Sequence, residues 1–383
     1  MLRFTAEQQE FRRVVAKFVD AEVAPVADDI DAHGEFPRAL FRRLGDLGYF
    51  GLRYPERYGG SEADMVTFCL LAEELGRGSM SLAANAMMQS LMGTYFVFKY
   101  GSEEQRERYL APAIRGELIG TFALTEPGAG SDLANLATQA HRDGDHWVLR
   151  GSKTWVTSAP IADFLTIGAK TSTERGMKHI ALFLVDRREM PGVVLSRKID
   201  KMSTRASDTG EIVLEDVRVP SSHLLGGETG GVEKVGGILS EARVMTAALS
   251  VGLARGAYRA ALKYARERVA FGKPIVEHQA IAFKLADMLT GIHGAALMTY
   301  EAAAALDRGE RATRECAMAK LVASETAVRV ADEGARIFAS YSLAMEYPAQ
   351  RYLRDSRFLL FGGGTSEILR LIIARELDEE IPS

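Results

Sequence analysis

Cysteine is scarce in this chain. Only two of its 383 residues are cysteines, Cys69 and Cys316, and they lie far apart in sequence of helical character. So few cysteines exclude a disulfide framework and a Cys-x-x-Cys metal site. We therefore expect no metal site, and we predict a reducing, cytoplasmic location.

An excess of charge of one sign and a long uninterrupted apolar run are also lacking. The 47 Lys and Arg residues nearly balance the 51 Asp and Glu residues, which gives a formal net charge of −4. This balance argues against nucleic acid as a partner and against a polybasic membrane signal. The stretch nearest to a membrane span, Met80 to Phe98, contains Asn85 and Gln89 among other polar residues. We predict one buried core helix here and no membrane insertion.

The apolar residues that are present are enough for a large core. Hydrophobic residues make up 47% of the chain and charged residues 26%, as in ordinary globular proteins. Helical periodicity covers the first part and returns after Gly231, and short period-two strands lie between. This order predicts an α+β protein with an N-terminal helical domain (residues 1–118), a middle β-barrel domain (119–228) and a C-terminal four-helix-bundle domain (229–383). A β-sandwich is the alternative for the middle domain.

The C-terminal region has the longest helical patterns. The first ends at Arg268, and Gly236-Gly237 near its start suggest an irregular beginning. Further helices are expected at about Gln279–Arg308, at about Thr313–Tyr341 and after Thr365.

The stretch Leu124–Asp132 joins a strand-like run to a glycine-bearing loop. The run from Phe122 is typical of a strand end, and the two glycines that follow let backbone N–H groups converge on an anion. Thr125 and Ser131 add hydroxyl donors. The loop lacks the Gly-Lys-Ser/Thr ending of a Walker loop and the spacing of a dinucleotide-binding G-x-G-x-x-G motif. It suits a pyrophosphate or an electron-accepting ring, and an ordinary Gly-rich turn is the alternative.

Two later segments carry residues of the same kind. Trp155 and Thr157 lie two positions apart, which places them on one face of a strand, on either side of a flat ring. The segment Arg266–Pro274 closes a long helical run with basic residues and a Gly-Lys-Pro stop, and His278 and Gln279 open the next helix.

These segments, taken in this order, resemble the acyl-CoA dehydrogenase flavoprotein family, as do Pro55–Gly60 near the start and Gly364–Ile368 near the end. The resemblance covers nearly the whole chain. It implies non-covalent FAD between the β region and the C-terminal helices, and α,β-dehydrogenation of an acyl thioester with hydride transfer to flavin N5. It also implies an electron-transferring flavoprotein as acceptor and a homodimer or homotetramer.

The resemblance assigns contacts with FAD to several stretches. From the same chain it implies Phe122, Thr125, Ser131, Trp155, Thr157, Thr365 and Glu367, and from a neighbouring subunit Arg268, Phe271 and Gln279. The chain departs from the family pattern at Arg336–Ser342, where most members have Gln followed by Gly-Gly-x-Gly. We expect Arg336 and Ser340 to lie beside the FAD phosphates instead. The substrate-contacting residues that the resemblance implies are Met88, Gln89, Ser131, Arg243 and Gly364.

The usual catalytic base is missing. In the resembled family it is most often a glutamate directly before the last Gly-Thr motif, and this chain has Gly363 there. A second family arrangement places the glutamate directly before an arginine of the central helix. Here that arginine is Arg243, preceded by Ala242, and Glu241 is one position further back. We expect Glu241 to be the base if the helix begins irregularly, with the N–H of Gly363 polarising the thioester carbonyl.

Three alternatives remain open from the sequence. The thioester is either an acyl-CoA or an acyl group on a carrier protein, because both present pantetheine. The missing base also suits a relative that does not desaturate, such as one carrying out desulfination. A catalytically silent flavin-binding or ligand-binding scaffold is the third alternative.

Overall fold

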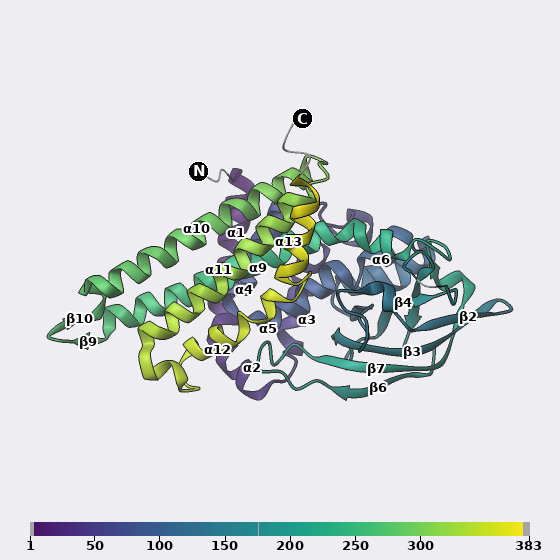
Figure 1. Ribbon diagram of the computed structural model, residues 1–383, viewed down its shortest axis with the longest axis horizontal. Coiled ribbons are helices and arrows are strands. Elements are labelled where there is room, and N and C mark those ends of the chain that lie inside the picture. Colours follow the sequence, from purple (N-terminus) through teal and green to yellow (C-terminus); the bar gives the residue numbers. More distant parts are fainter. Residues whose placement is uncertain (1–3, 175, 378–383) are drawn as a thin grey trace.

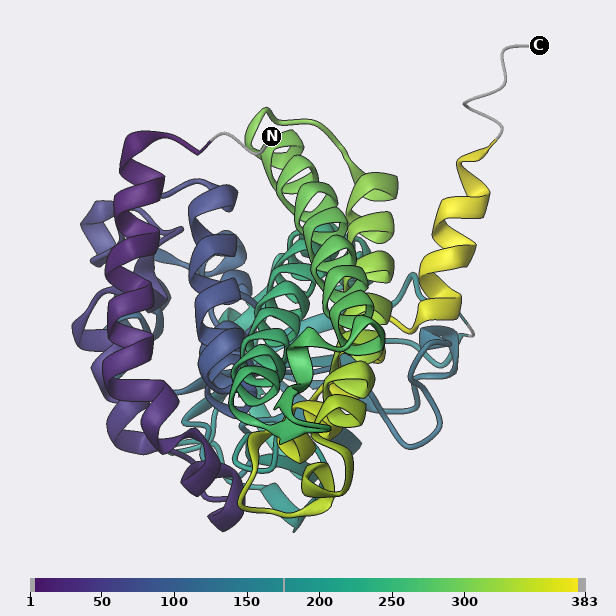
Figure 2. The same ribbon diagram turned by 90° about the vertical axis from the view of Figure 1, so that its left-hand side faces the viewer.

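The structure is a computed structural model that describes residues 4–174 and 176–377. The predicted domain ends at residues 1 and 383 lie outside this range. Helices from both ends of the chain pack side by side, and the strands of the middle region lie at one end of the molecule (Figure 1). In the view of Figure 2, α1 and the C-terminal α13 lie on opposite sides of the central helices.

The N-terminal helices begin at well-formed caps. The Thr5 side chain accepts a hydrogen bond from Gln8 N at 3.1 Å and the Gln8 side chain accepts one from Thr5 N at 3.0 Å, a capping box that opens α1. Asp64 caps α4 by accepting from Thr67 N at 2.7 Å. The helices are α1 Ala6–Phe18, α2 Ala27–His33, α3 Arg38–Asp46, α4 Met65–Gly78, α5 Met80–Met87, α6 Tyr95–Tyr100, α7 Glu103–Gln105 and α8 Ala111–Ile114.

The single helix predicted from Met80 to Phe98 is wrong. α5 ends at Met87, a π-helical turn follows at Met88–Met92, and α6 begins at Tyr95. The physical reason is the close approach of β1 at Gly93. A Cβ on Gly93 would lie 2.3 Å from the carbonyl oxygen of Gly120, so the helix must open there to admit the strand.

The middle region forms an eight-stranded sheet. Its order is β6-β7-β3-β2-β4-β5-β8, with β1 pairing parallel to β4. The sheet curls around its own apolar core, which includes Trp147 and Phe183. No hydrogen-bonded ladder among the described residues joins β6 to β8, so the barrel is open. The strands are β1 Gly120–Ala123, β2 Gln139–Asp143, β3 His146–Thr157, β4 Phe164–Lys170, β5 Ile180–Asp186, β6 Val193–Lys198, β7 Thr209–Pro220 and β8 Leu224–Leu225.

The C-terminal helices share one core with the N-terminal ones. The long helix α9 packs against α4, α10 and α11, and the buried apolar residues of both regions form a single cluster. The helices are α9 Gly231–Glu267, α10 Gln279–Asp307, α11 Thr313–Phe338, α12 Pro348–Asp355 and α13 Ser366–Arg375. The predicted α+β organisation of helix, sheet and helix regions is therefore confirmed.

Three details of the C-terminal prediction are wrong. α9 is continuous through Gly236 and Gly237, so its expected irregular start is absent. α11 ends at Phe338 because Ala339 leaves the helical conformation with φ of 52°. α12 was not predicted, although Pro348 at its first turn is the signal that marks such a start.

Two helices are long and apolar enough to cross a membrane by length and composition alone. In α9, 78% of the most apolar window is buried inside the fold, whereas in α10 the share is 28%. α9 is thus a core helix of the bundle, and α10 leaves Phe283 and Leu289 exposed. The absence of membrane insertion stays a prediction.

Candidate functional site

The glycine-bearing loop is a tight turn that opens toward free space. Glu126 N donates to the Ala129 carbonyl at 2.9 Å and Ala129 N donates to the Glu126 carbonyl at 3.1 Å. No atom lies within 4 Å of the position of a Cβ on Gly128 or Gly130. The backbone is therefore accessible to a large ligand at both glycines.

A buried ion pair holds this loop against β3. Lys153 Nζ lies 2.6 Å from Glu126 Oε1 and donates to the Leu124 carbonyl at 3.0 Å. Glu126 also accepts from the backbone N of Thr138 at 3.0 Å. Burial lowers the pKa of Lys153 to about 8, and the neighbouring Glu126 opposes this shift. This pair was not predicted from the sequence, because its one local signal is a lysine between Ser152 and Thr154 in a strand.

A β-bulge in β3 directs Trp155 outward. The ladder to β7 shifts register between Lys153 and Val156, and Trp155 adopts φ of 57°. Its side chain is 60% exposed, while Val156 is buried and Thr157 is half-buried. Trp155 and Thr157 therefore share the outer face of the strand, as predicted for a pair beside a flat ring.

The other predicted residues of this region lie close to the loop. Phe122 is half-buried at the end of β1 and stacks on Phe96, with ring centroids 4.8 Å apart. The carbonyl of Thr125 accepts from Thr154 N at 2.9 Å, which ties the loop to β3. Ser131 is exposed at the end of the loop.

Residues predicted to come from a neighbouring subunit lie far from this loop. Phe271 and Gly272, with φ of 51° and 80°, form the two-residue turn between β9 (Val269–Ala270) and β10 (Lys273–Pro274). The Phe271 side chain is 96% exposed, and Arg268 and Gln279 are exposed beside it. This hairpin lies at the opposite end of the molecule from the β domain (Figure 1). The chain therefore does not bring these residues to its own Trp155.

Replacing Arg268 by alanine tests the role of the hairpin. A guanidinium hydrogen-bonded to a phosphate is worth about 1.5 to 3 kcal/mol, so we expect FAD retention to weaken about tenfold or more. The guanidinium has no ion-pair partner among the described residues and lies 5.9 Å from the Tyr341 ring centroid. Arg266→Ala, an exposed arginine at the end of the same helix, is the control. Equal FAD retention by the two variants in equilibrium dialysis contradicts the assigned role.

Arg336 and Ser340, whose contact with the FAD phosphates stays a prediction, lie in the last turn of α11 and just after it. Arg336, which was expected beside the FAD phosphates, pairs with Asp332 on its own helix at 2.7 Å. Ser340 is exposed in the following 3₁₀ turn. Ala339 between them adopts φ of 52° and ψ of −134°, a conformation that favours glycine.

Replacing Ala339 by glycine is expected to stabilise the protein by about 1 kcal/mol, because glycine adopts this backbone conformation without strain. The measurement is the free energy of unfolding in urea. Ala335→Gly, in the regular part of α11, is the control and is expected to destabilise by about 1 kcal/mol. A loss of stability for Ala339→Gly as large as for Ala335→Gly contradicts the strain at residue 339.

The loop before α13 packs on α9. Gly363 and Gly364 adopt φ of 73° and 111°, and Thr365 caps α13 by accepting from Ile368 N at 3.3 Å. Lys320 Nζ donates to the Gly364 carbonyl at 2.7 Å and supports the loop from α11. Glu367 is exposed in the first turn of α13, where its own backbone N–H and the Thr365 side chain lower its pKa.

Glu241, Ala242 and Arg243, the three residues at the expected base, lie in different surroundings. Glu241 forms an ion pair with Arg53, and both side chains are about a quarter exposed. Ala242 is buried, and its carbonyl oxygen would lie 3.8 Å from a Cβ on Gly363. Arg243 is 7% exposed, and burial lowers its pKa. Glu241 as the base stays a prediction, and its carboxylate is already paired.

The predicted substrate residues of the π-helical turn also differ. Gln89 was expected to be a polar residue of the acyl pocket. Its amide instead donates to the carbonyls of Ala113 and Leu118 at 2.9 and 2.8 Å and accepts from Gly120 N at 2.9 Å. These hydrogen bonds hold the opened helix against α8, the segment before β1 and the start of β1. Met88 is half-buried and remains the candidate for contact with an acyl chain.

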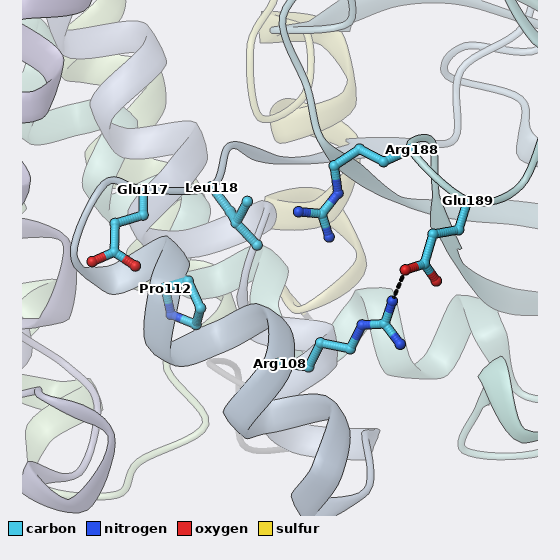
Figure 3. Close-up of a pocket in the computed structure, with 6 residues that line it drawn as sticks. All are labelled: Arg108, Pro112, Glu117, Leu118, Arg188 and Glu189. Atoms are coloured by element: carbon cyan, nitrogen blue, oxygen red, sulfur yellow. Dashed lines mark ion pairs between the residues drawn. The ribbon is translucent and has the colours of Figure 1, made fainter.

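A separate surface hollow lies between the N-terminal helices and the β domain (Figure 3). Arg108 and Glu189 form an ion pair across it. None of the predicted site residues lines it. Its lining residues are Arg108, Pro112, Glu117, Leu118, Arg188 and Glu189.

Sequence profiles of known families match almost the whole chain. The acyl-CoA dehydrogenase N-terminal domain matches residues 5–117, the middle domain residues 121–217 and the C-terminal domain residues 229–377. The chain belongs to the acyl-CoA dehydrogenase family. It is therefore an FAD flavoprotein and an oxidoreductase that acts on the CH–CH bond of acyl thioesters.

Individual members of the acyl-CoA dehydrogenase family resemble it over their full length. Benzylmalonyl-CoA dehydrogenase of Aromatoleum aromaticum is 48% identical, with 97% of this chain and 98% of that protein covered. The 3-(aryl)acrylate reductase of Clostridium sporogenes is 39% identical, with 98% and 99% covered.

Solved structures agree with this fold. Butyryl-CoA dehydrogenase from Megasphaera elsdenii matches with a TM-score of 0.95 at 33% identity, covering 98% of this chain and 99% of that chain. A chain in the structure titled electron transferring flavoprotein of Acidaminococcus fermentans matches with a TM-score of 0.95 at 34% identity, covering 98% and 99%. The FAD complex of PigA matches with a TM-score of 0.94 at 28% identity, covering 99% of each chain.

The site fits the FAD that the family binds. The backbone at Gly128 and Gly130 is open, and Trp155 presents an exposed ring from the bulge beside the loop. These residues would hold the flavin half of the cofactor, and the hairpin of a second subunit would hold the other half. Bound FAD supplies a two-electron acceptor.

Proposed function

We propose that this acyl-CoA dehydrogenase oxidises a CoA thioester whose β carbon carries an aryl group. The names of two relatives support this substrate class, because benzylmalonyl and 3-aryl acrylate skeletons both place a ring on that carbon. The observation that carries the oxidation itself is the open glycine loop beside the exposed ring of Trp155. That surface suits a bound flavin and has no other occupant among the described residues.

The acyl group would lie between α9 and the opened helix after α5. Met88, Met92 and Tyr95 are half-buried there. The Tyr95 hydroxyl lies 3.8 Å from the position of a Cβ on Gly237, so this segment faces the first turns of α9. Methionine and tyrosine side chains suit an aromatic substituent, because thioethers and rings both pack well against an aromatic face.

The residues of the Gly363 loop would position the thioester. The N–H of Gly363 is expected to polarise the thioester carbonyl, which stabilises negative charge on oxygen as the enolate forms. Lys320 and the cap at Thr365 fix the conformation of the loop. Arg243, Gly364 and Ser131 are proposed to contact the substrate.

Three further points belong to the proposal. The electron acceptor is an electron-transferring flavoprotein, which the matched chain in the Acidaminococcus fermentans structure supports. The active form is a homodimer or homotetramer, because the β9–β10 hairpin, which carries Phe271, lies at the opposite end of the molecule from β3, which carries Trp155 (Figure 1). The enzyme is cytoplasmic.

A substrate panel tests the proposed function. The holoenzyme is mixed anaerobically with 3-phenylpropanoyl-CoA, benzylmalonyl-CoA, butyryl-CoA and octanoyl-CoA, and loss of the visible flavin absorbance is followed. We expect at least one aryl thioester to reduce the flavin faster than either alkyl thioester. Faster reduction by an alkyl thioester contradicts the substrate class, and no reduction by any thioester contradicts the oxidation.

A further inference from the structure

The position where a proton would be taken from the α carbon holds no carboxylate. A Cβ on Gly363 would lie 3.3 Å from Thr246 Oγ1 and 3.8 Å from the Ala242 carbonyl oxygen. The two places where this family carries its glutamate therefore lie against each other in this chain. Both are occupied by residues that cannot accept a proton, Gly363 and Ala242.

Glu241 does not fill this gap. It lies one position before Ala242, a rotation of about 100° on a regular helix, and α9 is regular at this point. Its carboxylate is paired with Arg53, whose cation would have to be left without its partner if Glu241 turned toward the loop. Burial lowers the pKa of the Arg53 guanidinium, but the neighbouring Glu241 carboxylate outweighs this effect, so the pKa of Arg53 lies above its ordinary value.

Two buried cations, Arg243 and Lys320, lie at the Gly363 loop, and the carboxylates of Glu325 and Glu367 act on Lys320 without forming an ion pair with it among the described residues. Arg243 is 7% exposed, its Nε has no hydrogen-bond partner, and no described carboxylate lies within ion-pair distance of it. Lys320 is fully buried and donates only to the carbonyls of Leu360 and Gly364. Burial lowers the pKa of Lys320 to about 8. A buried cation without a partner is costly, and an anionic ligand would offset that cost.

We propose that the substrate carries a carboxylate on its α carbon, and that loss of this carboxylate as CO2 replaces removal of the α proton. This inference rests on the proposed function and names its substrate class as a 2-carboxyacyl thioester with a β-aryl group.

The reaction balances without a base. The bond between the α carbon and the carboxylate breaks, CO2 leaves, and the electron pair stays on the thioester as an enolate. The enolate pair then forms the double bond between the α and β carbons, while a hydride leaves the β carbon for the flavin. The thioester is oxidised to the 2-enoyl-CoA, FAD is reduced by two electrons, and no proton is gained or lost by the protein.

The test compares benzylmalonyl-CoA with 3-phenylpropanoyl-CoA, which differ only in the α carboxylate. With the wild-type holoenzyme we expect benzylmalonyl-CoA to reduce the flavin and release CO2 in equal amounts. We expect 3-phenylpropanoyl-CoA to reduce it at least about 100-fold more slowly, the typical contribution of a general base. A product that keeps its carboxylate, or equal rates for the two thioesters, overturns the inference.

Two further measurements separate this inference from the proposed function. In the first, 3-phenylpropanoyl-CoA is incubated with the enzyme in D2O, and NMR is expected to show that its α protons do not exchange. Exchange that occurs with the wild type and is abolished in Glu241→Gln would identify Glu241 as a base and overturn the inference. Ala242→Glu, which places a carboxylate directly before Arg243, is expected to speed oxidation of 3-phenylpropanoyl-CoA about 100-fold or more. Reduction by 3-phenylpropanoyl-CoA alone overturns the inference but leaves the proposed function intact, whereas reduction by neither thioester contradicts both.

Discussion

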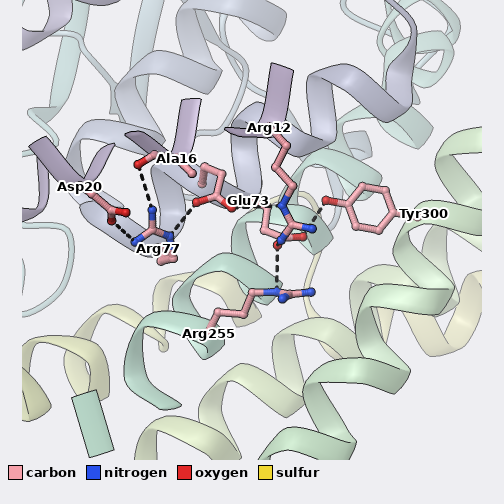
Figure 4. A network of polar contacts seen from close by, with 8 residues as sticks. Arg12, Ala16, Asp20, Glu73, Arg77, Arg255 and Tyr300 are labelled. Carbon is pink, nitrogen blue, oxygen red and sulfur yellow. Dashed lines mark hydrogen bonds and ion pairs between the residues drawn. The ribbon is translucent and has the colours of Figure 1, made fainter. Parts of the chain in front are cut away.

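Replacing Glu73 by alanine is expected to destabilise the fold by about 3 to 5 kcal/mol, the usual cost of removing one partner from a buried ion pair. Glu73 lies on α4 and is fully buried. Its carboxylate accepts from Arg12 at 2.6 Å and from the Tyr300 hydroxyl at 2.6 Å, and it forms an ion pair with Arg255 at 2.8 Å. Those partners come from α1, α9 and α10, so one side chain joins four helices (Figure 4).

The alanine variant would leave two partly buried cations and a buried hydroxyl without their anionic partner. Burial already raises the pKa of Tyr300 well above its ordinary value, and the neighbouring Glu73 adds to this, so the hydroxyl cannot ionise to compensate. The measurement is the free energy of unfolding in urea. The control is Glu10→Ala, because Glu10 pairs with Arg13 on the exposed face of α1 and little change is expected there. Equal stability of the two variants contradicts the assigned role of Glu73.

Replacing Lys153 by methionine is expected to weaken FAD retention more than tenfold. The variant leaves Glu126 as a buried carboxylate without its cation, and Glu126 is the residue that fixes the turn containing Gly128. Breaking such a pair costs about 3 to 5 kcal/mol, and we expect most of that cost to fall on the loop that is proposed to hold the flavin. FAD retention is measured by equilibrium dialysis of the holoenzyme. Arg150→Met, in an exposed ion pair on the same strand, is the control.

The same pair predicts a pH dependence. Because the pKa of Lys153 is lowered to about 8, the charged pair is complete below that pH and is lost as the pH rises through it. FAD retention of the wild-type enzyme is therefore expected to fall above pH 8. The free energy of unfolding is expected to change in the opposite direction. Between this pKa and the ordinary lysine pKa the unfolded chain binds more protons than the folded one, so Lys153 makes the free energy of unfolding rise with pH. A wild-type profile as flat as that of Lys153→Met contradicts the electrostatic role of the pair.

The sequence predicted the order of elements and the glycine-bearing turn after β1. Period-two strands and long helical runs located the middle sheet region and the end of α9, because their apolar patterns are regular. The glycine loop was found because its turn chemistry is local. The ion pair of Glu126 and Lys153 was not, since it joins a residue of the glycine-bearing loop to a residue of β3 through the fold rather than through a motif.

The features that the sequence did not predict also depend on contacts between distant parts of the chain. The helix after Met80 is interrupted by a strand that approaches Gly93 from a distant part of the chain. Gln89 was read as a pocket residue, yet the interruption creates the free backbone groups that its amide satisfies. Periodicity within one segment carries no information about such an approach. Glu241 as the base stays a prediction, and its pairing with Arg53, a residue far away in the sequence, could not be predicted from the sequence.

The central claim is that this chain seats FAD beside an acyl thioester and oxidises it. The most direct measurement is the visible absorbance of the FAD-reconstituted protein during anaerobic titration with aryl thioesters. The account predicts a single FAD per chain and loss of the oxidised flavin spectrum as benzylmalonyl-CoA is added. Protein that takes up no FAD, or FAD that stays oxidised with every thioester added, would contradict it.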